Sequence, residues 1–455
     1  MAHRATRIIE FVQLIYWTNL LYGLLLNAQS RQLQMYAIFY EVIRMDLRKD
    51  CDQIVTYAIS QVQPDAAVRR ALENHPGFAT DRLFVIAVGK AAWTMARAAI
   101  DCLGCRPDDG IVITKYHHSQ GPLEGLRIME AGHPVPDENT FLATQQVLSL
   151  TENLTQQDTV LFLLSGGGSA LFELPLIPND ELQSITKQLL ACGADITEIN
   201  TIRKRLSKVK GGRFAQHCAP AQVMSIILSD IIGDPIDMIA SGPAYPDSST
   251  CQQALAIAEK YQLTLSAQAR ALLGKETPKE LDNVVTQVTG SVHQLCVAAA
   301  EACSALGYRP TIVTDKLTCE AKAAGTNLAE MAKAHQLTSK SLAFIAGGET
   351  VVKLTGSGLG GRNQELALSA AEHIGDCTHT AVFSIGSDGT DGPTDAAGGF
   401  VTEKTGEILA QKGICIRDAL ADNDSYHALK ACDGLIITGP TGTNVNDVAV
   451  VLIKR

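Results

Sequence analysis

The sequence predicts an α/β protein with two domains, and three observations support this expectation. Helical segments alternate with short apolar runs, which is typical of a mostly parallel sheet covered by helices on both faces. These runs lie at residues 83–88, 110–114, 159–164 and 223–228. A polar stretch at residues 274–283 interrupts the alternation, which then resumes with apolar runs at residues 311–314, 341–345, 380–385 and 435–438.

The length agrees with this organisation, since 455 residues suggest two or three domains. We expect a Rossmann-like N-terminal domain over residues 45–283, a second α/β domain with a mostly parallel sheet over residues 284–455, and an active site in the cleft between them. Residues 1–44 do not follow the pattern of the two domains. In this segment basic residues precede an apolar stretch, which polar side chains interrupt. We expect this segment to be an extension outside the fold, with translation starting at Met45.

The composition is that of an acidic globular protein. There are 38 Lys and Arg against 48 Asp and Glu, which gives a net charge of −10. Because no basic run stands out, we expect no nucleic-acid partner, and a small anionic substrate needs cations placed locally. The 12 Cys are scattered, as in a cytoplasmic protein with reduced thiols. The apolar stretch near the N-terminus is too polar for a membrane span, so no membrane partner is expected.

A glycine run follows the apolar run at 159–164 directly, and it is formed by Ser165, Gly166, Gly167, Gly168 and Ser169. Glycines let the backbone approach a ligand closely and point consecutive N–H groups at an anion. Lys90 ends another apolar run, where its point charge suits a phosphate or a carboxylate. Ligands of such sheets bind at the carboxyl ends of the strands, where both features lie. The alternatives are a flexible turn and a solvated lysine.

Residues 356–361 match the pattern Gly-x-Gly-x-x-Gly, which ends with Gly360 and Gly361. We expect a strand at residues 351–354 before it and a helix at residues 363–371 after it. This arrangement imitates the dinucleotide fingerprint and supports an NAD(P)-dependent enzyme. Arg362, however, places a guanidinium at the start of the helix, where it suits a phosphoryl group. The motif alone does not separate a kinase from a reductase.

Acidic residues collect after two further apolar runs, as Asp230 and Asp234 in one segment and Asp388, Asp391 and Asp395 in another. Carboxylates near phosphates usually hold Mg²⁺ or accept a hydroxyl proton. The alternative is structural, because Asp caps helices and Asp-Gly forms turns. For Asp395 we expect a helix cap.

Several of these segments occur together in the order that one family shares. The chain resembles class II glycerate 2-kinases, whose N-terminal domain is similar to residues 88–92, 132–140, 164–169, 199–204, 210–213, 241–243 and 246–249. The C-terminal MOFRL domain of that family is similar to residues 347–350, 360–365, 388–398 and 439–447. Residues 1–44 lie outside the resemblance.

The resemblance implies ATP-dependent phosphorylation of the 2-hydroxyl of D-glycerate in a cleft between the domains. The key lysine and arginine of the family fall on Lys90 and Arg362. Phosphoryl-transfer chemistry then assigns Mg²⁺ to Asp230 or Asp388 and the proton of the glycerate hydroxyl to Asp234 or Asp391. The glycine loops bind anionic oxygens. An NAD(P)-dependent hydroxypyruvate reductase remains the alternative, and a homodimer remains open.

Overall fold

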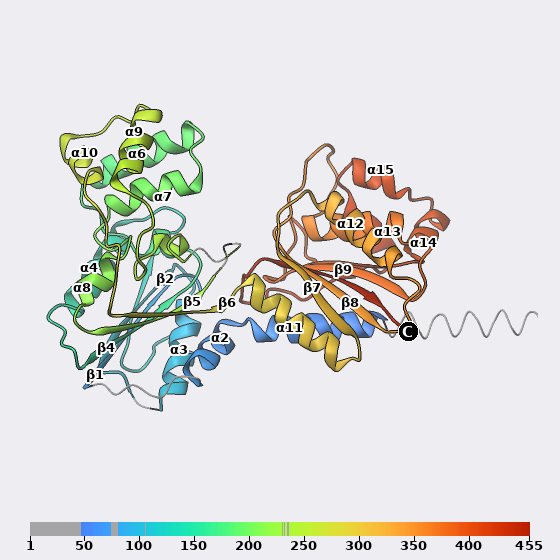
Figure 1. Cartoon of the computed structure of the whole chain (residues 1–455), viewed down its shortest axis with the longest axis horizontal. Coiled ribbons are helices and arrows are strands. Elements are labelled where there is room, and N and C mark those ends of the chain that lie inside the picture. The colour runs from blue at the N-terminus through green and yellow to red at the C-terminus, as the bar shows by residue number, and fades with distance from the viewer. Residues whose placement is uncertain (1–46, 74–80, 105, 230, 232, 234–235) are drawn as a thin grey trace, which may run out of the picture.

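The computed structural model describes residues 47–73, 81–104, 106–229, 231, 233 and 236–455. These residues form two α/β bodies that lie side by side, each built on a six-stranded sheet (Figure 1). The expected α/β fold with two domains is therefore confirmed. The predicted extension at residues 1–44 lies outside the described residues. Among the described helices, none combines the length and apolar character that crossing a membrane requires.

The first sheet is parallel throughout, with strand order β3-β2-β1-β4-β5-β6. Its strands are β1 (Arg82–Val88), β2 (Asp109–Lys115), β3 (Arg127–Ala131), β4 (Asp158–Leu164), β5 (Gln222–Leu228) and β6 (Val284–Gly290). The four runs expected as strands are confirmed as β1, β2, β4 and β5. The edge strands β3 and β6 were not expected, because they are only half-buried and mix polar with apolar residues.

Helices cover both faces of this sheet, as the alternation predicts. On one face, α2 (Pro64–Glu73) and α3 (Ala92–Leu103) pack against Val85 and Ala87 of β1. On the other face, α4 (Glu138–Leu150) and α8 (Arg213–Cys218) pack against Ile86 and Val88. Because side chains alternate along a strand, one apolar run serves both layers. Because helices cover both faces of the sheet, polar side chains that bind a ligand must lie at the ends of its strands.

A group of helices extends beyond the carboxyl ends of these strands (Figure 1). It contains α6 (Asn179–Ala191), α7 (Ile196–Arg205), α9 (Cys251–Lys260) and α10 (Ala267–Leu273). These helices share an apolar cluster of their own, which is separate from the core of the sheet. The short helix α5 (Gly168–Leu171) starts inside the glycine run and connects β4 to this group.

The second sheet is mixed, with strand order β11-β10-β9-β12-β8-β7. It contains β7 (Arg309–Leu317), β8 (Leu342–Gly348), β9 (Thr380–Gly386), β10 (Gly398–Thr402), β11 (Leu435–Ile436) and β12 (Asp447–Ile453). Within the described residues, β7 and β8 run parallel and the other neighbouring pairs are antiparallel. The expectation of a mostly parallel second sheet is wrong, because an apolar run indicates a strand but not its direction.

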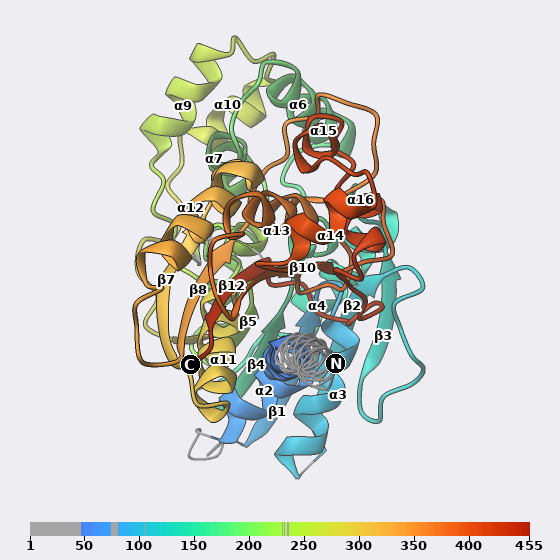
Figure 2. The same cartoon turned by 90° about the vertical axis from the view of Figure 1, so that its right-hand side faces the viewer.

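Helices also cover this sheet on both faces. The helix of residues 47–61 and α11 (Val292–Ala305) lie on one face, packed against Phe383 and Val450. On the other face lie α12 (Ala321–Ala334), α13 (Arg362–His373), α14 (Thr405–Gln411), α15 (Ile416–Ala421) and α16 (Ser425–Ala431). Figure 2 shows α12, α13 and α14 over the sheet.

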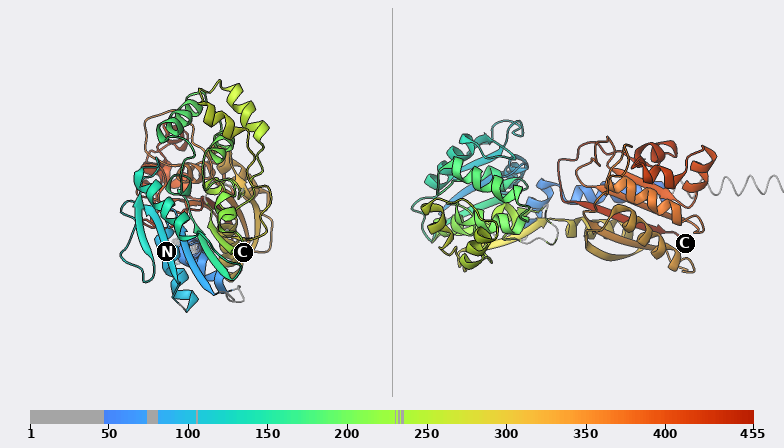
Figure 3. Two further views of the ribbon diagram at one scale, coloured as in Figure 1. Left: turned by 90° about the vertical axis from the view of Figure 1, so that its left-hand side faces the viewer. Right: turned by 90° about the horizontal axis from the view of Figure 1, so that it is seen from above.

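The described chain crosses between the bodies twice (Figure 3, right). The helix of residues 47–61 belongs to the second body, where Tyr308 and Lys454 both donate to Asp50, whereas α2 packs on the first. The second crossing follows β6, which pairs with β5, so the chain leaves the first sheet after Gly290 rather than at residue 283. Arg70 joins the two crossings by donating to the carbonyl oxygens of Gln61 (2.6 Å) and Thr289 (3.3 Å).

Candidate active site

The ends of β1 and β4 bring Lys90 and the glycine run together. Val88 and Leu164 pair in register at the last positions of these strands. Beyond them, the Lys90 amide donates to Gly166 O at 2.9 Å, and Ser165 Oγ accepts from the Ala91 amide at 3.1 Å. The approach is so close that a Cβ on Gly89 would lie 2.2 Å from Ser165 Oγ. The two loops therefore form one rigid unit.

Donor groups of this unit are available to a ligand. Within the described part of the chain, the amides of Gly166 and Gly167 donate to no acceptor. Gly167 has a left-handed φ of +88°, and a Cβ on it would lie 3.1 Å from His133 Nε2 and 3.4 Å from Lys90 Cε. The Lys90 ammonium is exposed, and no carboxylate of the described residues pairs with it. Two free amides beside an unpaired cation suit an anion.

Both bodies line the cavity in front of this unit. The cavity has a volume of about 300 Å³. The first body contributes Lys90, His118, Ser165 and Gly166, among others, and the second body contributes residues 442–444. A ligand held by Lys90 therefore lies at the junction of the two bodies, where the sequence predicts the active site. The predicted metal ligand Asp230 and the predicted base Asp234 lie outside the described residues.

Arg362 is the first residue of α13. It lies beside the second sheet, where β8 and β9 end and β12 begins at Asp447. Its Nε and Nη2 donate to the two carboxylate oxygens of Asp447 at 2.5 and 3.0 Å, and its Nη1 donates to Glu349 at 2.9 Å. Burial raises the pKa of the Asp447 carboxyl to about 6, although Arg362 acts in the opposite direction. Burial is the largest influence on the pKa of Arg362 and lowers it, but the hydrogen bond to Asp447 and the nearby carboxylate charges together outweigh burial, so the pKa is raised.

Asp391 caps the helix that carries Arg362. Its carboxylate is 3% exposed and accepts the backbone amides of Asn363 (3.1 Å) and Gln364 (2.8 Å) as well as both side-chain amides. Burial raises the pKa of this carboxyl, while the same hydrogen bonds lower it. These contacts are those of a structural cap, and they give no support to Asp391 as a general base.

Asp388 follows β9 and remains half-buried. Its Oδ1 accepts from the amide and the hydroxyl of Thr390 at 2.9 and 3.1 Å. A Cβ added to Gly386, the last residue of β9, would lie 3.4 Å from Asp388 Oδ1 and 3.5 Å from Asp447 Oδ1. Both carboxylates are therefore at the carboxyl end of β9. No group of three or more possible metal-ligating side chains occurs among the described residues.

The Gly-x-Gly-x-x-Gly segment lacks the structure of a dinucleotide loop. The strand expected at residues 351–354 is wrong, since Val351 forms an isolated bridge with Glu320 and the following residues are irregular. The glycines are instead needed for packing on the protein itself. Added Cβ atoms on Gly356, Gly358, Gly360 and Gly361 would lie 2.2 to 2.5 Å from atoms of Asp422, Asp424, Ser425 and Asp391. The expected helix after the segment is confirmed as α13.

The cap expected at Asp395 is also wrong. Asp395 precedes the strand β10 rather than a helix, and its Oδ1 accepts the hydroxyl of Tyr426 at 2.8 Å. The short Ala/Gly-rich stretch that follows it suits a tightly packed strand as well as a helix start, so local sequence could not decide between them.

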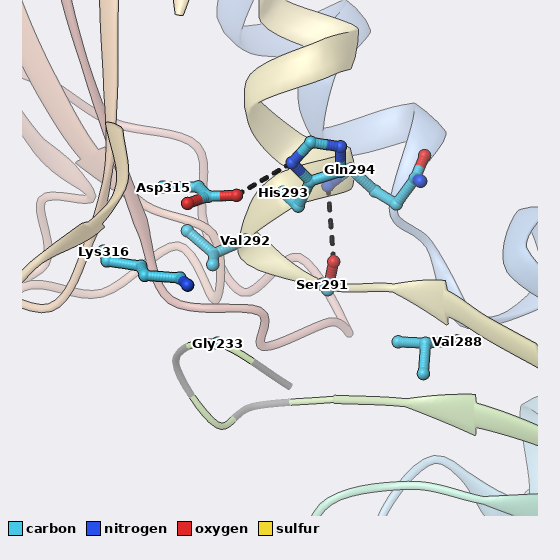
Figure 4. Close-up of a pocket in the computed structure, with 8 residues that line it drawn as sticks. All are labelled: Gly233, Val288, Ser291, Val292, His293, Gln294, Asp315 and Lys316. Carbon is cyan, nitrogen blue, oxygen red and sulfur yellow. Dashed lines mark hydrogen bonds and ion pairs between the residues drawn. The ribbon is translucent and has the colours of Figure 1, made fainter. Parts of the chain in front are cut away.

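A second cavity, of about 240 Å³, lies elsewhere on the junction (Figure 4). Gly233 and Val288 line it from the first body, and His293, Asp315 and Lys316 line it from the second. His293 Nδ1 and Asp315 Oδ2 lie 2.8 Å apart, so this carboxylate already has a partner. Of the predicted site residues that the structure describes, none lines this cavity, and we place no substrate in it.

Comparisons with known proteins identify the family of the chain. A family model described as a domain of unknown function, DUF4147, matches residues 50–274, and the MOFRL family model matches residues 342–447. A D-glycerate 2-kinase of Thermotoga maritima is 50% identical over 413 residues, which cover 90% of this chain and 98% of that protein. The chain belongs to the glycerate 2-kinase family.

A solved structure and a differently named relative complete the comparison. The crystal structure of a glycerate kinase from Thermotoga maritima aligns with a TM-score of 0.85 and 49% identity, covering 90% of this chain and 100% of that one. A protein of Agrobacterium vitis named as a putative hydroxypyruvate reductase is 37% identical over 414 residues, or 88% of this chain and 93% of that protein.

Within the glycerate 2-kinase frame, sequence reasoning missed Asp447 and Glu349 as partners of Arg362. Asp447 ends the segment 439–447, which was identified only as part of the resemblance to the MOFRL domain. Its signal was present, since a carboxylate at the start of a fully buried strand needs a cation. Glu349 lies immediately after β8 and is exposed, so its sequence position carried no comparable signal.

Proposed function

We propose that the protein transfers the γ-phosphoryl group of ATP to the 2-hydroxyl of D-glycerate, giving 2-phospho-D-glycerate. The observation that carries the proposal is the shared cavity, in which Lys90 and Gly166 of the first body face residues 442–444 of the second. The segment 439–447 continues from that cavity to Asp447, the partner of Arg362. One loop thus links the two cations that the reaction requires.

The first body binds an anionic group. The unpaired ammonium of Lys90 and the free amides of Gly166 and Gly167 form a preorganised donor set, which needs no rearrangement when negative charge arrives. Either the glycerate carboxylate or an ATP phosphate fits this chemistry. The second cation, Arg362, is held in a fixed orientation by its bidentate pair with Asp447 and stabilises the phosphoryl group during transfer.

Mg²⁺ is the cofactor that phosphoryl transfer implies. Such sites usually use one or two carboxylates together with substrate phosphates, so the lack of a three-residue cluster among the described side chains is compatible with it. Asp388 fits a Mg²⁺ ligand, because its half-buried carboxylate lies at the same end of β9 as Asp447. The ion would neutralise charge on the phosphates. Asp230 stays a candidate on sequence grounds.

A carboxylate must accept the proton of the glycerate hydroxyl. Of the two candidates, Asp391 is occupied by four amide groups at the start of α13. We therefore favour Asp234 as the base. A cytoplasmic location follows from the scattered Cys and stays part of the proposal.

The reductase alternative receives no support from the glycine-rich segment, because its glycines pack against residues 391 and 422–425. The decisive experiment supplies D-glycerate, ATP and Mg²⁺ to the purified protein. Enolase and pyruvate kinase in the coupling mixture report 2-phosphoglycerate, and phosphoglycerate mutase is omitted so that 3-phosphoglycerate gives no signal. We expect a signal without mutase. A signal only with mutase would show that the 3-hydroxyl is phosphorylated. No signal in either assay, together with NAD(P)H oxidation in the presence of hydroxypyruvate, would establish the reductase.

A further inference from the structure

The segment of residues 210–213 lies behind the glycine run and has no part in the function proposed so far. Lys210 is completely buried, with a relative exposure of 0%. Its ammonium donates to Ser169 O at 2.9 Å, to Phe172 O at 3.1 Å and to Ala240 O at 3.5 Å. A buried lysine is costly unless its charge is used, so this placement calls for an explanation.

The carbonyl groups of Ser169 and Phe172 belong to α5 and its C-terminal end. The last carbonyls of a helix have no partner within the helix, and a nearby Lys or Arg can satisfy them. Arg203 adds a second charged donor, 3.2 Å from Ser169 O. Because α5 begins at Gly168, bonds at its end determine where the glycine run of residues 165–169 lies.

The charges around Lys210 do not cancel. Glu173 is completely buried, and its Oε2 lies 3.6 Å from Lys210 Nζ and 3.5 Å from Arg203 Nη2. Two cations thus share one carboxylate, which leaves a positive balance behind the loop. Burial lowers the pKa of Lys210 to about 8, and Glu173 acts against this shift. A positive balance at this depth favours an anion on the other side of the loop.

The residues next to Lys210 hold the loop from a second direction. The amides of Gly211 and Gly212 donate to Ser241 O (3.0 Å) and Gly242 O (2.7 Å). This fixes Ala240, whose φ of +50° is unusual for a residue other than glycine. A Cβ on Gly168 would lie 2.8 Å from Ala240 Cβ, so Ala240 packs directly under the loop.

We propose that Lys210 is a positioning residue for the anion-binding loop of residues 165–169: by bonding the end of α5 it holds the amides of Gly166 and Gly167 in place beside the cavity that Gly166 lines. The proposal rests on the proposed function, since it assumes that this loop binds an anionic substrate group. Lys210 is too buried to touch that group and acts through Ser169 and Phe172.

The test compares two buried lysines of the same domain. Lys204 is 1% exposed and pairs with Asp237 (3.2 Å) and Asp247 (3.0 Å), but it makes no bond to residues 165–172. Lys210→Met and Lys204→Met thus both remove a buried ammonium, and only the first removes a loop contact. We expect Lys210→Met to raise KM for one substrate, ATP or D-glycerate, at least tenfold, with the other KM unchanged. Lys204→Met should leave both KM values within threefold of the wild type.

Equal kinetic changes in the two variants, or a lower kcat with both KM values unchanged in Lys210→Met, would overturn the proposal. Calorimetric titration with tripolyphosphate reads the same loop without turnover, so the outcome does not depend on the reaction catalysed. There we expect weaker binding to Lys210→Met only, and equal binding to both variants would count against the loop contact. If Lys210→Met does not fold, Arg203→Gln removes the second donor to Ser169 O and should weaken tripolyphosphate binding in the same direction. A wild type that binds tripolyphosphate but lacks kinase activity would refute the proposed function alone.

Discussion

Replacing Asp447, the bidentate partner of Arg362, by Asn should change stability and activity in opposite directions. The Asp447 carboxylate is 6% exposed, and its pKa is raised to about 6 from an ordinary value of 3.8. Below pH 4 the carboxyl is protonated in both the folded and the unfolded protein. As the pH rises from about 4 to 6, the unfolded chain releases this proton more readily than the folded one, so stability falls. Above pH 6 the carboxyl is ionised in both states, and the free energy of unfolding falls no further on its account.

The size of the effect follows from the difference between the two pKa values. A difference of 6 − 3.8 corresponds to about 3 kcal/mol, at ~1.36 kcal/mol for each pKa unit. Asn has nearly the same shape but no charge, so Asp447→Asn removes the loss. We expect the variant to match the wild type at pH 4 and to exceed its free energy of unfolding at pH 8 by up to about 3 kcal/mol.

Activity should change in the opposite direction. Arg362 loses the charge of its bidentate partner, and a small displacement of a catalytic group costs roughly 100-fold in turnover. The assay is thermal unfolding at pH 4, 6 and 8, followed by steady-state kinetics at pH 8. Glu349→Gln is the matched control, because it removes the other, more exposed carboxylate partner of Arg362. That change should alter stability by less than about 1 kcal/mol.

The reasoning would be refuted if Asp447→Asn were less stable than the wild type at pH 8, or if the difference were the same at pH 4 and pH 8. Unchanged turnover would show that Arg362 does not depend on this pair for its orientation.

Three further predictions concern the glycine loops and α13. Lys90→Ala should lower kcat at least ~100-fold with an unchanged melting temperature, and near-normal turnover would remove Lys90 from the mechanism. Gly358→Ala should destabilise the protein by roughly 1–3 kcal/mol in thermal unfolding, because the new Cβ would lie 2.5 Å from Asp424 Cβ; an unaffected melting temperature would contradict the packing role. Asp391→Ala leaves two buried amides of α13 unpaired and should cost roughly 2 kcal/mol or more, with faster hydrogen exchange in the first turn of α13; unchanged exchange there would contradict the cap.

The central strands could be predicted because their chemistry is local. A strand buried on both faces is a continuous apolar run, and β1, β4 and β8 are of this kind. The edge strands β3 and β6 have one free edge and mixed side chains, so nothing in their sequence separates them from loops. Strand direction in the second sheet was mispredicted for a related reason, because it depends on how the connections fold rather than on the strand itself.

The candidate site divides in the same way. Lys90 and the glycine run stood out because each follows a buried strand, and adjacent parallel strands bring their ends together. Asp391 had the same sequence signal, yet its carboxylate caps α13. Asp caps and Asp bases look alike in a sequence, because the difference depends on which amides lie opposite.

By itself, the sequence determined the two-domain α/β architecture, the central strands, and the cations Lys90 and Arg362 at strand or helix ends. These features depend on apolar periodicity and on glycine or charge placed next to it. Only the tertiary structure decided that Arg362 pairs with Asp447, 85 residues away. It also decided that the glycines of residues 356–361 pack against other parts of the protein, and that the buried ammonium of Lys210 donates to Ser169 O at the end of the glycine run. Such contacts join segments distant in the chain, and no local pattern encodes which buried groups will meet.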